Sequence, residues 1–302
     1  MLHSSRNGLK PYLQLTKPRV VALLAFTAVV GMFLATPGFV PLDVLVVATL
    51  GISLAAGSAA AFNHILEQRL DAIMARTRAR PLPAGKLSRR QAIIFATILA
   101  LLSMALLVIG VNMLTAALTF LSLIGYSIIY TLLLKPATPQ NIVIGGAAGA
   151  APPVLGWTAV TGNVDYDALL LFLIVFVWTP PHFWSLALYR EKEYAKVGIP
   201  MLPVTHGSEF TRKCILLYTI LLAAVTLLPF TTRMSGLFYM VGAIALNAGF
   251  IVYSWRLYRN YSDALARKTF SYSILYLGTL FALLLIDHYS CGIYEVIKSA
   301  IY

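Results

Sequence analysis

The chain alternates long apolar runs with short polar links along nearly its whole length. Nine stretches almost free of charge approach or reach the ~20 residues that a helix needs to cross a bilayer. They cover residues 20–36, 42–62, 91–110, 113–134, 141–161, 166–189, 214–232, 236–255 and 270–286. Only Gly110, Val111 and Asn112 separate the third run from the fourth, which leaves the count open between eight and nine. We therefore predict an all-α, polytopic membrane protein.

The polar links are too short to form a soluble domain. The longest of them are 63–90 and 190–213. We expect residues 1–302 to form one integral-membrane domain with its functional loops in these two links. The links resemble each other, since each places acids, bases and a proline pair after an apolar run, and this favours two similar halves around one cavity.

The basic residues predict how the runs are oriented. With the N-terminus in the cytoplasm, only Arg233 and Lys298 of the 23 Lys and Arg residues face outside. This asymmetry is what the positive-inside rule describes, and nine spans would place the C-terminus outside. Basic loops beside anionic lipid explain the net charge of +12 without a nucleic acid partner. The first run shows no cleavage site and the leader is not typical of a transit peptide, so we expect a retained helix in a bacterial plasma (inner) membrane.

Three oxygen-bearing side chains recur every four positions at the end of the second run: Asn63, Glu67 and Asp71. On an α-helix this spacing places them on one stripe ~12 Å long. Hard oxygen ligands suit Mg²⁺, which normally keeps substrate phosphates among its ligands. We predict that the stripe binds Mg²⁺ and, through it, a diphosphate. The alternative is the polar end of a helix entering water, but such polarity has no reason to follow one stripe.

Basic residues follow this stripe. Arg76 and Arg80 lie within a short reach of Asp71 and are predicted to bind phosphate oxygens. Lys135, at the end of the fourth run, is either a further phosphate contact or a lysine that snorkels to the interface. Arg89 and Arg90 are attributed to membrane topology.

The sixth run ends in an aromatic segment that contains two adjacent prolines. Pro180 and Pro181 remove two backbone donors and are expected to break the helix beside His182. An ionisable residue at membrane depth indicates a functional site by default. A buried imidazole can bind metal, move a proton or donate to phosphate, and the sequence does not choose among these. The tryptophans of this segment could instead belong to an interfacial aromatic belt.

Small residues are concentrated at 145–151, directly before Pro152 and Pro153. Missing side-chain bulk lets helix backbones approach closely, and the two prolines interrupt the backbone hydrogen bonds. We expect a tightly packed, kinked helix here.

Together these motifs resemble the intramembrane prenyltransferases of the UbiA superfamily, and within it the protohaem IX farnesyltransferase (haem O synthase) branch. The resemblance is carried by Asn63-x3-Glu67-x3-Asp71-x4-Arg76-Thr77-x2-Arg80-Pro81-Leu82, Tyr130-Thr131-x3-Lys135, the segment from Asn141 to Pro153, Gly156-Trp157, the string 178–184 and Pro200-Met-Leu-Pro-Val204. The string 178–184 is typical of the haem-modifying branch. The resemblance implies a nine-helix bundle around a central cavity, with farnesyl diphosphate and protohaem as substrates.

The resemblance also implies roles for individual residues. Asn63, Glu67 and Asp71 carry over as the Mg²⁺-diphosphate motif. The predicted diphosphate contacts are Arg76, Arg80, Tyr130 and Lys135, and the predicted catalytic set is Asn63, Glu67, Asp71, His182 and Lys192. The candidates for contact with haem or the prenyl chain are Tyr126, Trp178, Phe183, Trp184 and Tyr189. Most of the superfamily has a second aspartate-rich motif where this chain has His182, Tyr189, Lys192 and Glu193, so the number of metal ions stays open.

The mechanism we expect begins with stabilisation of the leaving diphosphate by Mg²⁺ and the basic side chains. The farnesyl chain gains allylic cation character, the haem vinyl group attacks, and water completes the substituent of haem O. Haem is thus a substrate and not a cofactor. Haem A synthase or haem-copper oxidase assembly could receive the product.

Two other functions are compatible with many membrane spans. Prenylation of a quinone precursor predicts a second aspartate-rich loop, which is missing near 182–194. A small-molecule transporter usually places its charged binding groups near the bilayer midplane, whereas the acids here lie mainly at helix ends.

Overall fold

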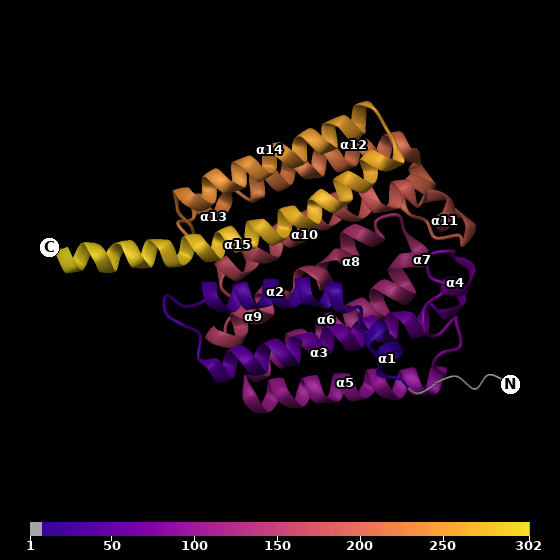
Figure 1. Ribbon diagram of the computed structural model, residues 1–302, viewed down its shortest axis with the longest axis horizontal. Coiled ribbons are helices and arrows are strands. Elements are labelled where there is room, and N and C mark those ends of the chain that lie inside the picture. Colours follow the sequence, from indigo (N-terminus) through magenta and orange to yellow (C-terminus); the bar gives the residue numbers. More distant parts are fainter. Residues whose placement is uncertain (1–7, 302) are drawn as a thin grey trace.

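The computed structural model describes residues 8–301, with side chains described as far as Ser290. Within that part of the chain all regular elements are helices (Figure 1). They are α1 (Leu9–Leu15), α2 (Pro18–Leu34), α3 (Leu42–Leu66), α4 (Gln68–Ile73), α5 (Arg89–Gly110), α6 (Met113–Ile124), the π-helix η1 (Gly125–Leu134), α7 (Lys135–Ala137), α8 (Asn141–Ala150), α9 (Pro152–Thr161), α10 (Tyr166–Tyr189), α11 (Glu191–Lys196), α12 (Leu202–Val225), α13 (Leu228–Thr231), α14 (Leu237–Arg259) and α15 (Asp263–Ile301).

The length and hydropathy of these helices confirm a multi-pass membrane protein. Among the described residues eight helices are long and apolar enough to cross a bilayer, and the pair α1 and α2, bent by 55°, makes a ninth if it counts as one span. The ambiguous third and fourth runs are two spans, because α5 ends at Gly110 and α6 begins at Met113. Asn112 makes this tight link possible, since its side chain caps α6 by accepting from the Thr115 N–H at 2.8 Å.

The long helices pack lengthwise in a bundle. α3 packs along α5, α2 along α9, and α10 along both α12 and α15. The short helices α1, α4, α7 and α11 gather at one end of the bundle, on the right in Figure 1, while α13 lies at the other end. We call the first of these the site end, because the two long polar links fold there.

Close backbone packing joins α2 to α9. A Cβ atom on Gly156 would lie 1.9 Å from the carbonyl oxygen of Ala28, and one on Gly31 would lie 2.2 Å from that of Pro153. No real Cβ tolerates such distances, so both glycines are required for this approach. The interruption expected at Pro152 is confirmed, since α8 ends at Ala150 and α9 begins at Pro152.

The helix break expected at Pro180 and Pro181 is wrong. α10 continues through both prolines to Tyr189. Neighbouring hydroxyls reach the backbone around the prolines: Thr179 and Ser185 each donate to the carbonyl four positions earlier, at 2.8 and 2.7 Å. The prolines leave the carbonyls of Phe176 and Val177 without their N–H donors, and neither hydroxyl reaches these two. Packing of α10 against its neighbouring helices therefore holds it helical through the prolines.

Candidate functional site

The predicted oxygen stripe spans a hinge and not one continuous helix. Glu67, with φ −92° and ψ 7°, ends α3 and precedes α4. The Glu67 N–H nevertheless donates to the Asn63 carbonyl at 3.0 Å, and the Asp71 N–H to the Glu67 carbonyl at 2.8 Å. This four-residue pattern survives the bend, so the expected register is kept. The side chains of Asn63, Glu67 and Asp71 are all buried.

Each carboxylate of the stripe pairs with a different cation. Arg80 Nη1 donates to both oxygens of Asp71 at 2.8 Å. Lys135, from the beginning of α7, donates to Glu67 Oε1. The turn after α4 makes the first pair possible, because the buried Thr77 hydroxyl donates to the Asp71 carbonyl at 2.9 Å and folds the chain back.

A third cation, which the sequence interpretation used only for topology, reaches the amide of the stripe. Lys17 Nζ donates to Asn63 Oδ1 at 2.7 Å. The charges of Glu67, Asp71 and Arg80 all act on Lys17, which places them around one site. No local pattern singles out Lys17, because its partner comes from a different part of the chain.

Two tyrosines of η1 form a wall beside Asn63. Asn63 Nδ2 donates to Thr131 Oγ1 at 3.3 Å, and Thr131 in turn donates to the Tyr126 carbonyl at 2.9 Å. The rings of Tyr126 and Tyr130 stack with centroids 5.6 Å apart. Gly145 of α8 gives the second ring its room, since a Cβ there would lie 2.2 Å from Tyr130 Cδ2. π-Helical segments often occur at functional sites.

His182 lies in a seam between α10 and α15. Its Nδ1 is 2.6 Å from Ser273 Oγ, and its ring stacks between Trp178 and Phe270, at 4.2 and 4.6 Å. Trp178 Nε1 donates to the Ser273 carbonyl at 2.8 Å. The imidazole is therefore held in a fixed orientation by rings on both faces.

The remaining predicted residues separate into two kinds. Tyr189 continues the seam, and Phe183, 39% exposed, contacts the His182 ring edge-on. Trp184, by contrast, is 2% exposed and packs against Tyr218 in the apolar core of the bundle. Lys192 is exposed and makes no hydrogen bond or ion pair within the described residues. The structure thus does not bring Trp184 or Lys192 to the stripe.

Arg76 is exposed and has no ion pair within the described part of the chain. Its charge acts on Tyr189 and Tyr194 as well as on Lys17, so it lies between the stripe and the end of α10. The two groups of predicted residues therefore adjoin at the site end.

Tyr194 of α11 is a further residue that the sequence interpretation missed. It is buried, and burial raises the pKa of its hydroxyl, which stays a neutral donor at physiological pH. A comparison of the two polar links could have identified Tyr194 from the sequence. Arg190 ends α10 as Glu67 ends α3, each is followed by a six-residue helix, and Tyr194 then stands where Asp71 stands.

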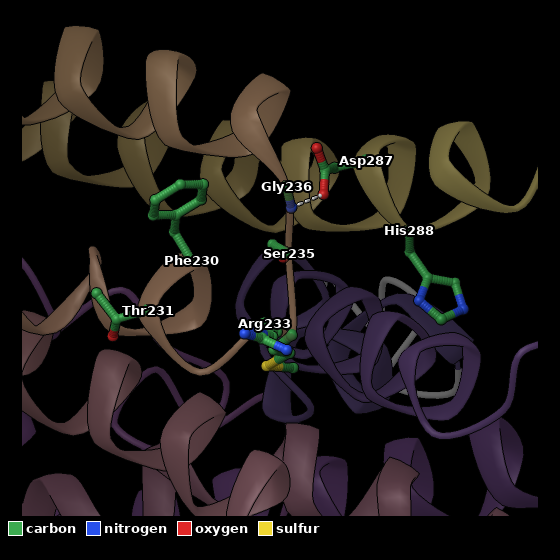
Figure 2. A pocket seen from close by; sticks show the side chains of 8 residues that line it. Phe230, Thr231, Arg233, Ser235, Gly236, Asp287 and His288 are labelled. Carbon is green, nitrogen blue, oxygen red and sulfur yellow. Dashed lines mark hydrogen bonds between the residues drawn. The ribbon is translucent and has the colours of Figure 1, made fainter. Parts of the chain in front are cut away.

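A cavity of about 660 Å³ lies at the other end of the bundle. Phe230, Thr231, Arg233, Ser235, Gly236, Asp287 and His288 line it (Figure 2). Asp287 accepts from the Gly236 N–H and, at 3.0 Å, from the Tyr239 N–H, which caps α14. This cavity contains none of the predicted site residues.

Comparison with known proteins places this chain in a family. Residues 24–284 match the family described as the UbiA prenyltransferase family. A protein named protoheme IX farnesyltransferase from Nitrosospira multiformis is 61% identical, over 92% of this chain and 93% of its own length. One of the same name from Thiobacillus denitrificans is 59% identical, over 96% of this chain and 97% of its own.

Solved structures share the fold at low sequence identity. A structure of digeranylgeranylglyceryl phosphate synthase superposes with a TM-score of 0.77 at 18% identity, covering 93% of this chain and 98% of that one. A UbiA homolog from Archaeoglobus fulgidus, bound to DMAPP and Mg²⁺, gives 0.64 at 18% identity, covering 90% and 98%.

Proposed function

This chain belongs to the UbiA prenyltransferase family, and on that premise we propose that it transfers a farnesyl group from farnesyl diphosphate to a vinyl group of protohaem IX, giving haem O. The observation that carries this proposal is the 61% identity, over 92% of the chain, to a protein named for that activity. The site supports it, because buried oxygen donors, a ring of cations and an aromatic wall are what ionisation of an allylic diphosphate requires.

Asn63, Glu67 and Asp71 fit a hard divalent cation such as Mg²⁺, being two carboxylates and an amide on a four-residue register. When bound with the diphosphate, Mg²⁺ supplies charge neutralisation of the leaving group. No three His, Cys, Asp or Glu side chains of the described residues lie close enough to hold a metal alone. Substrate phosphate would complete such a site, which is the usual mode for this ion.

Lys17, Arg80 and Lys135 hold the protein oxygens in ion pairs or hydrogen bonds. Three cations against two carboxylates leave an excess of one positive charge. A diphosphate ester carrying Mg²⁺ has a formal charge of about −1, so its binding balances the site and allows the three cations to turn their N–H groups to phosphate oxygens. Arg76 is an additional cation at its edge.

The chain's aromatic residues would serve the two reacting groups. The faces of Tyr126 and Tyr130, stacked beside Thr131, can stabilise allylic cation character on the prenyl chain. Phe183, 39% exposed beside the buried stack of Trp178 and His182 in the α10–α15 seam, offers flat apolar surface to the porphyrin. Because the stripe is buried, water is kept from the allylic cation of the prenyl chain until the vinyl group attacks.

We propose that the site end faces the cytoplasm of a bacterium, with the C-terminus outside. The links rich in Lys and Arg gather at that end together with α4, α7 and α11, as the positive-inside rule requires (Figure 1). Reporter fusions after Gly85 and after Arg233 should give opposite cytoplasmic and exported signals. The reverse signals would overturn this orientation.

The activity is tested with purified protein in nanodiscs, supplied with haem, farnesyl diphosphate and Mg²⁺, and analysed by mass spectrometry. We expect haem O from the wild type and a loss of at least about a hundredfold in Asp71→Asn and Glu67→Gln, because each removes a charge from the Mg²⁺-diphosphate contact. Asp43→Asn is the matched control, an exposed carboxylate in the first turn of α3.

Each outcome separates the possible functions. Absence of haem O from the wild type, with farnesyl diphosphate left intact, would favour a carrier. Consumption of farnesyl diphosphate only with a quinone precursor would indicate another acceptor. Full activity of Asp71→Asn would exclude the metal-diphosphate role of the stripe.

A further inference from the structure

Two guanidinium groups lie over the ring of Tyr189 at the last turn of α10. Arg190 Cζ lies 5.2 Å from the ring centroid and Arg267 Cζ lies 5.3 Å from it. The charge of Arg76 also acts on this tyrosine. These arginines come from the end of α10, from α15 and from the turn after α4, so only the tertiary structure brings them together.

The positive charge of this cluster is not balanced by the protein. Glu193 pairs with Arg190. Arg267 and Arg76 are exposed and have no carboxylate partner among the described residues. The cations that could serve the diphosphate, Lys17, Arg80 and Lys135, already contact the stripe. The cluster around Tyr189 is therefore a second group of cations, which shares only Arg76 with the edge of the diphosphate site.

An aromatic surface leads from this cluster into the span. Phe270 lies one turn after Arg267 on α15, and its ring stacks on His182. Phe183, 39% exposed, contacts the imidazole edge-on. Flat apolar groups thus extend from guanidinium groups at the site end toward the middle of the bundle, which matches a ligand that is flat, apolar and anionic at one edge.

We propose that Arg267, together with Arg190, binds the propionate carboxylates of the haem acceptor, with the macrocycle along Phe270 and Phe183, beside the buried His182. The inference rests on the proposed function, in which protohaem is the acceptor. Protohaem carries both carboxylates on one edge and its vinyl groups away from that edge. Anchoring the carboxylates at the site end would direct the vinyl groups into the bundle. Arginine suits this task, because its planar fork matches a carboxylate and keeps its charge.

The test compares Arg267→Gln and Arg267→Lys with Lys268→Gln, an exposed cation at the next position of α15. Haem binding is titrated by Soret absorbance without farnesyl diphosphate, using free protohaem and its propionate dimethyl ester. We expect Arg267→Gln to weaken protohaem binding by about tenfold, the effect of one charge-assisted contact. Arg267→Lys should lose less, and Lys268→Gln should bind as the wild type does.

The diester separates an anchor from a merely structural role. The wild type should bind the diester at least as weakly as Arg267→Gln binds free protohaem, because the ester removes both carboxylate contacts and the substitution removes only one. Arg267→Gln should therefore distinguish the two forms of haem less than the wild type does. In turnover, Arg267→Gln should raise the KM for haem and leave the KM for farnesyl diphosphate unchanged.

Wild-type protein that binds both forms equally would overturn the proposal, even if Arg267→Gln failed to fold. Arg267→Gln with wild-type affinity for protohaem would overturn it as well. Failure of the proposed function has a different signature, since it is the absence of haem O from wild-type protein under turnover conditions.

Discussion

Lys17 donates a hydrogen bond from its ammonium group to the side-chain oxygen of Asn63 across 2.7 Å, although 46 positions separate the two residues. Lys17 adopts φ 49° and ψ 60°, the left-handed region that a side chain other than glycine seldom occupies. This backbone conformation lies at the 55° bend between α1 and α2. The bend therefore directs the Lys17 side chain toward the stripe. Among the described residues of α1 and α2, Lys17 is the only cation that contacts it.

Replacement of Lys17 by Met should impair diphosphate binding. It removes one of three cations while Glu67 and Asp71 keep their charge, so the repulsion of phosphate increases. We expect the KM for farnesyl diphosphate to rise by about tenfold or more, as for the loss of one charge-assisted contact, with a smaller effect on the KM for haem. Arg19→Met, an exposed cation two positions later, is the control. Equal KM values for Lys17→Met and the wild type would contradict this role.

Replacement of Arg80 by Met should destabilise the protein. The Asp71 side chain is 3% exposed, and without Arg80 its buried charge has no partner. The cost of such a broken pair is about 3 kcal/mol, visible as a lower Tm in detergent. Arg78→Met changes an exposed cation in the same turn and should leave the Tm unchanged.

The double variant Asp71→Asn/Arg80→Met separates stability from activity. Neutralising Asp71 removes the unpaired charge, so much of the lost Tm should return, whereas haem O formation should not. A double variant less stable than Arg80→Met would show that the unpaired carboxylate is not the cause.

Replacement of Gly156 by Ala should disrupt the contact of α2 with α9. Its Cβ would lie 1.9 Å from a backbone oxygen, which cannot rotate away as a side chain does. Overpacking of this kind costs about 1–3 kcal/mol or more, measured as a fall in Tm or in the yield of monodisperse protein. Gly149→Ala, where a Cβ meets nothing within 4 Å, is the matched control and should be tolerated.

Replacement of Ser273 by Ala should affect the haem acceptor more than the diphosphate. It removes the hydroxyl 2.6 Å from His182 Nδ1 and frees the imidazole to change its tautomer within the aromatic stack. We expect a higher KM for haem, an unchanged KM for farnesyl diphosphate and an altered pH profile of kcat. Ser271→Ala, an exposed serine on the same helix, should match the wild type in all three measurements.

The sequence alone determined the membrane architecture and the pattern of the stripe. Runs of apolar residues can satisfy their backbone in lipid only as helices, so the spans and their approximate bounds follow from hydropathy. The four-residue spacing of Asn63, Glu67 and Asp71 predicted a shared register, and the backbone keeps it through the hinge at Glu67. The helix interruption at Pro152 was also predictable, whereas the glycines that allow close backbone approach, Gly31 and Gly156, lie outside the segment 145–151 where it was expected.

Only the tertiary structure decided which cation reaches which oxygen. The partners Lys17 and Lys135 come from helices distant in sequence, and their contacts depend on a left-handed residue and a π-helix that no local pattern indicates. The same holds for α10, which stays helical through two prolines because its packing against neighbouring helices offsets the two lost donors. Arg267 is the clearest example. From hydropathy its charge indicates only membrane topology, whereas the packing of α15 on α10 places its guanidinium group over the Tyr189 ring. Hydropathy and spacing are properties of a segment, but the pairing of charges depends on how segments pack.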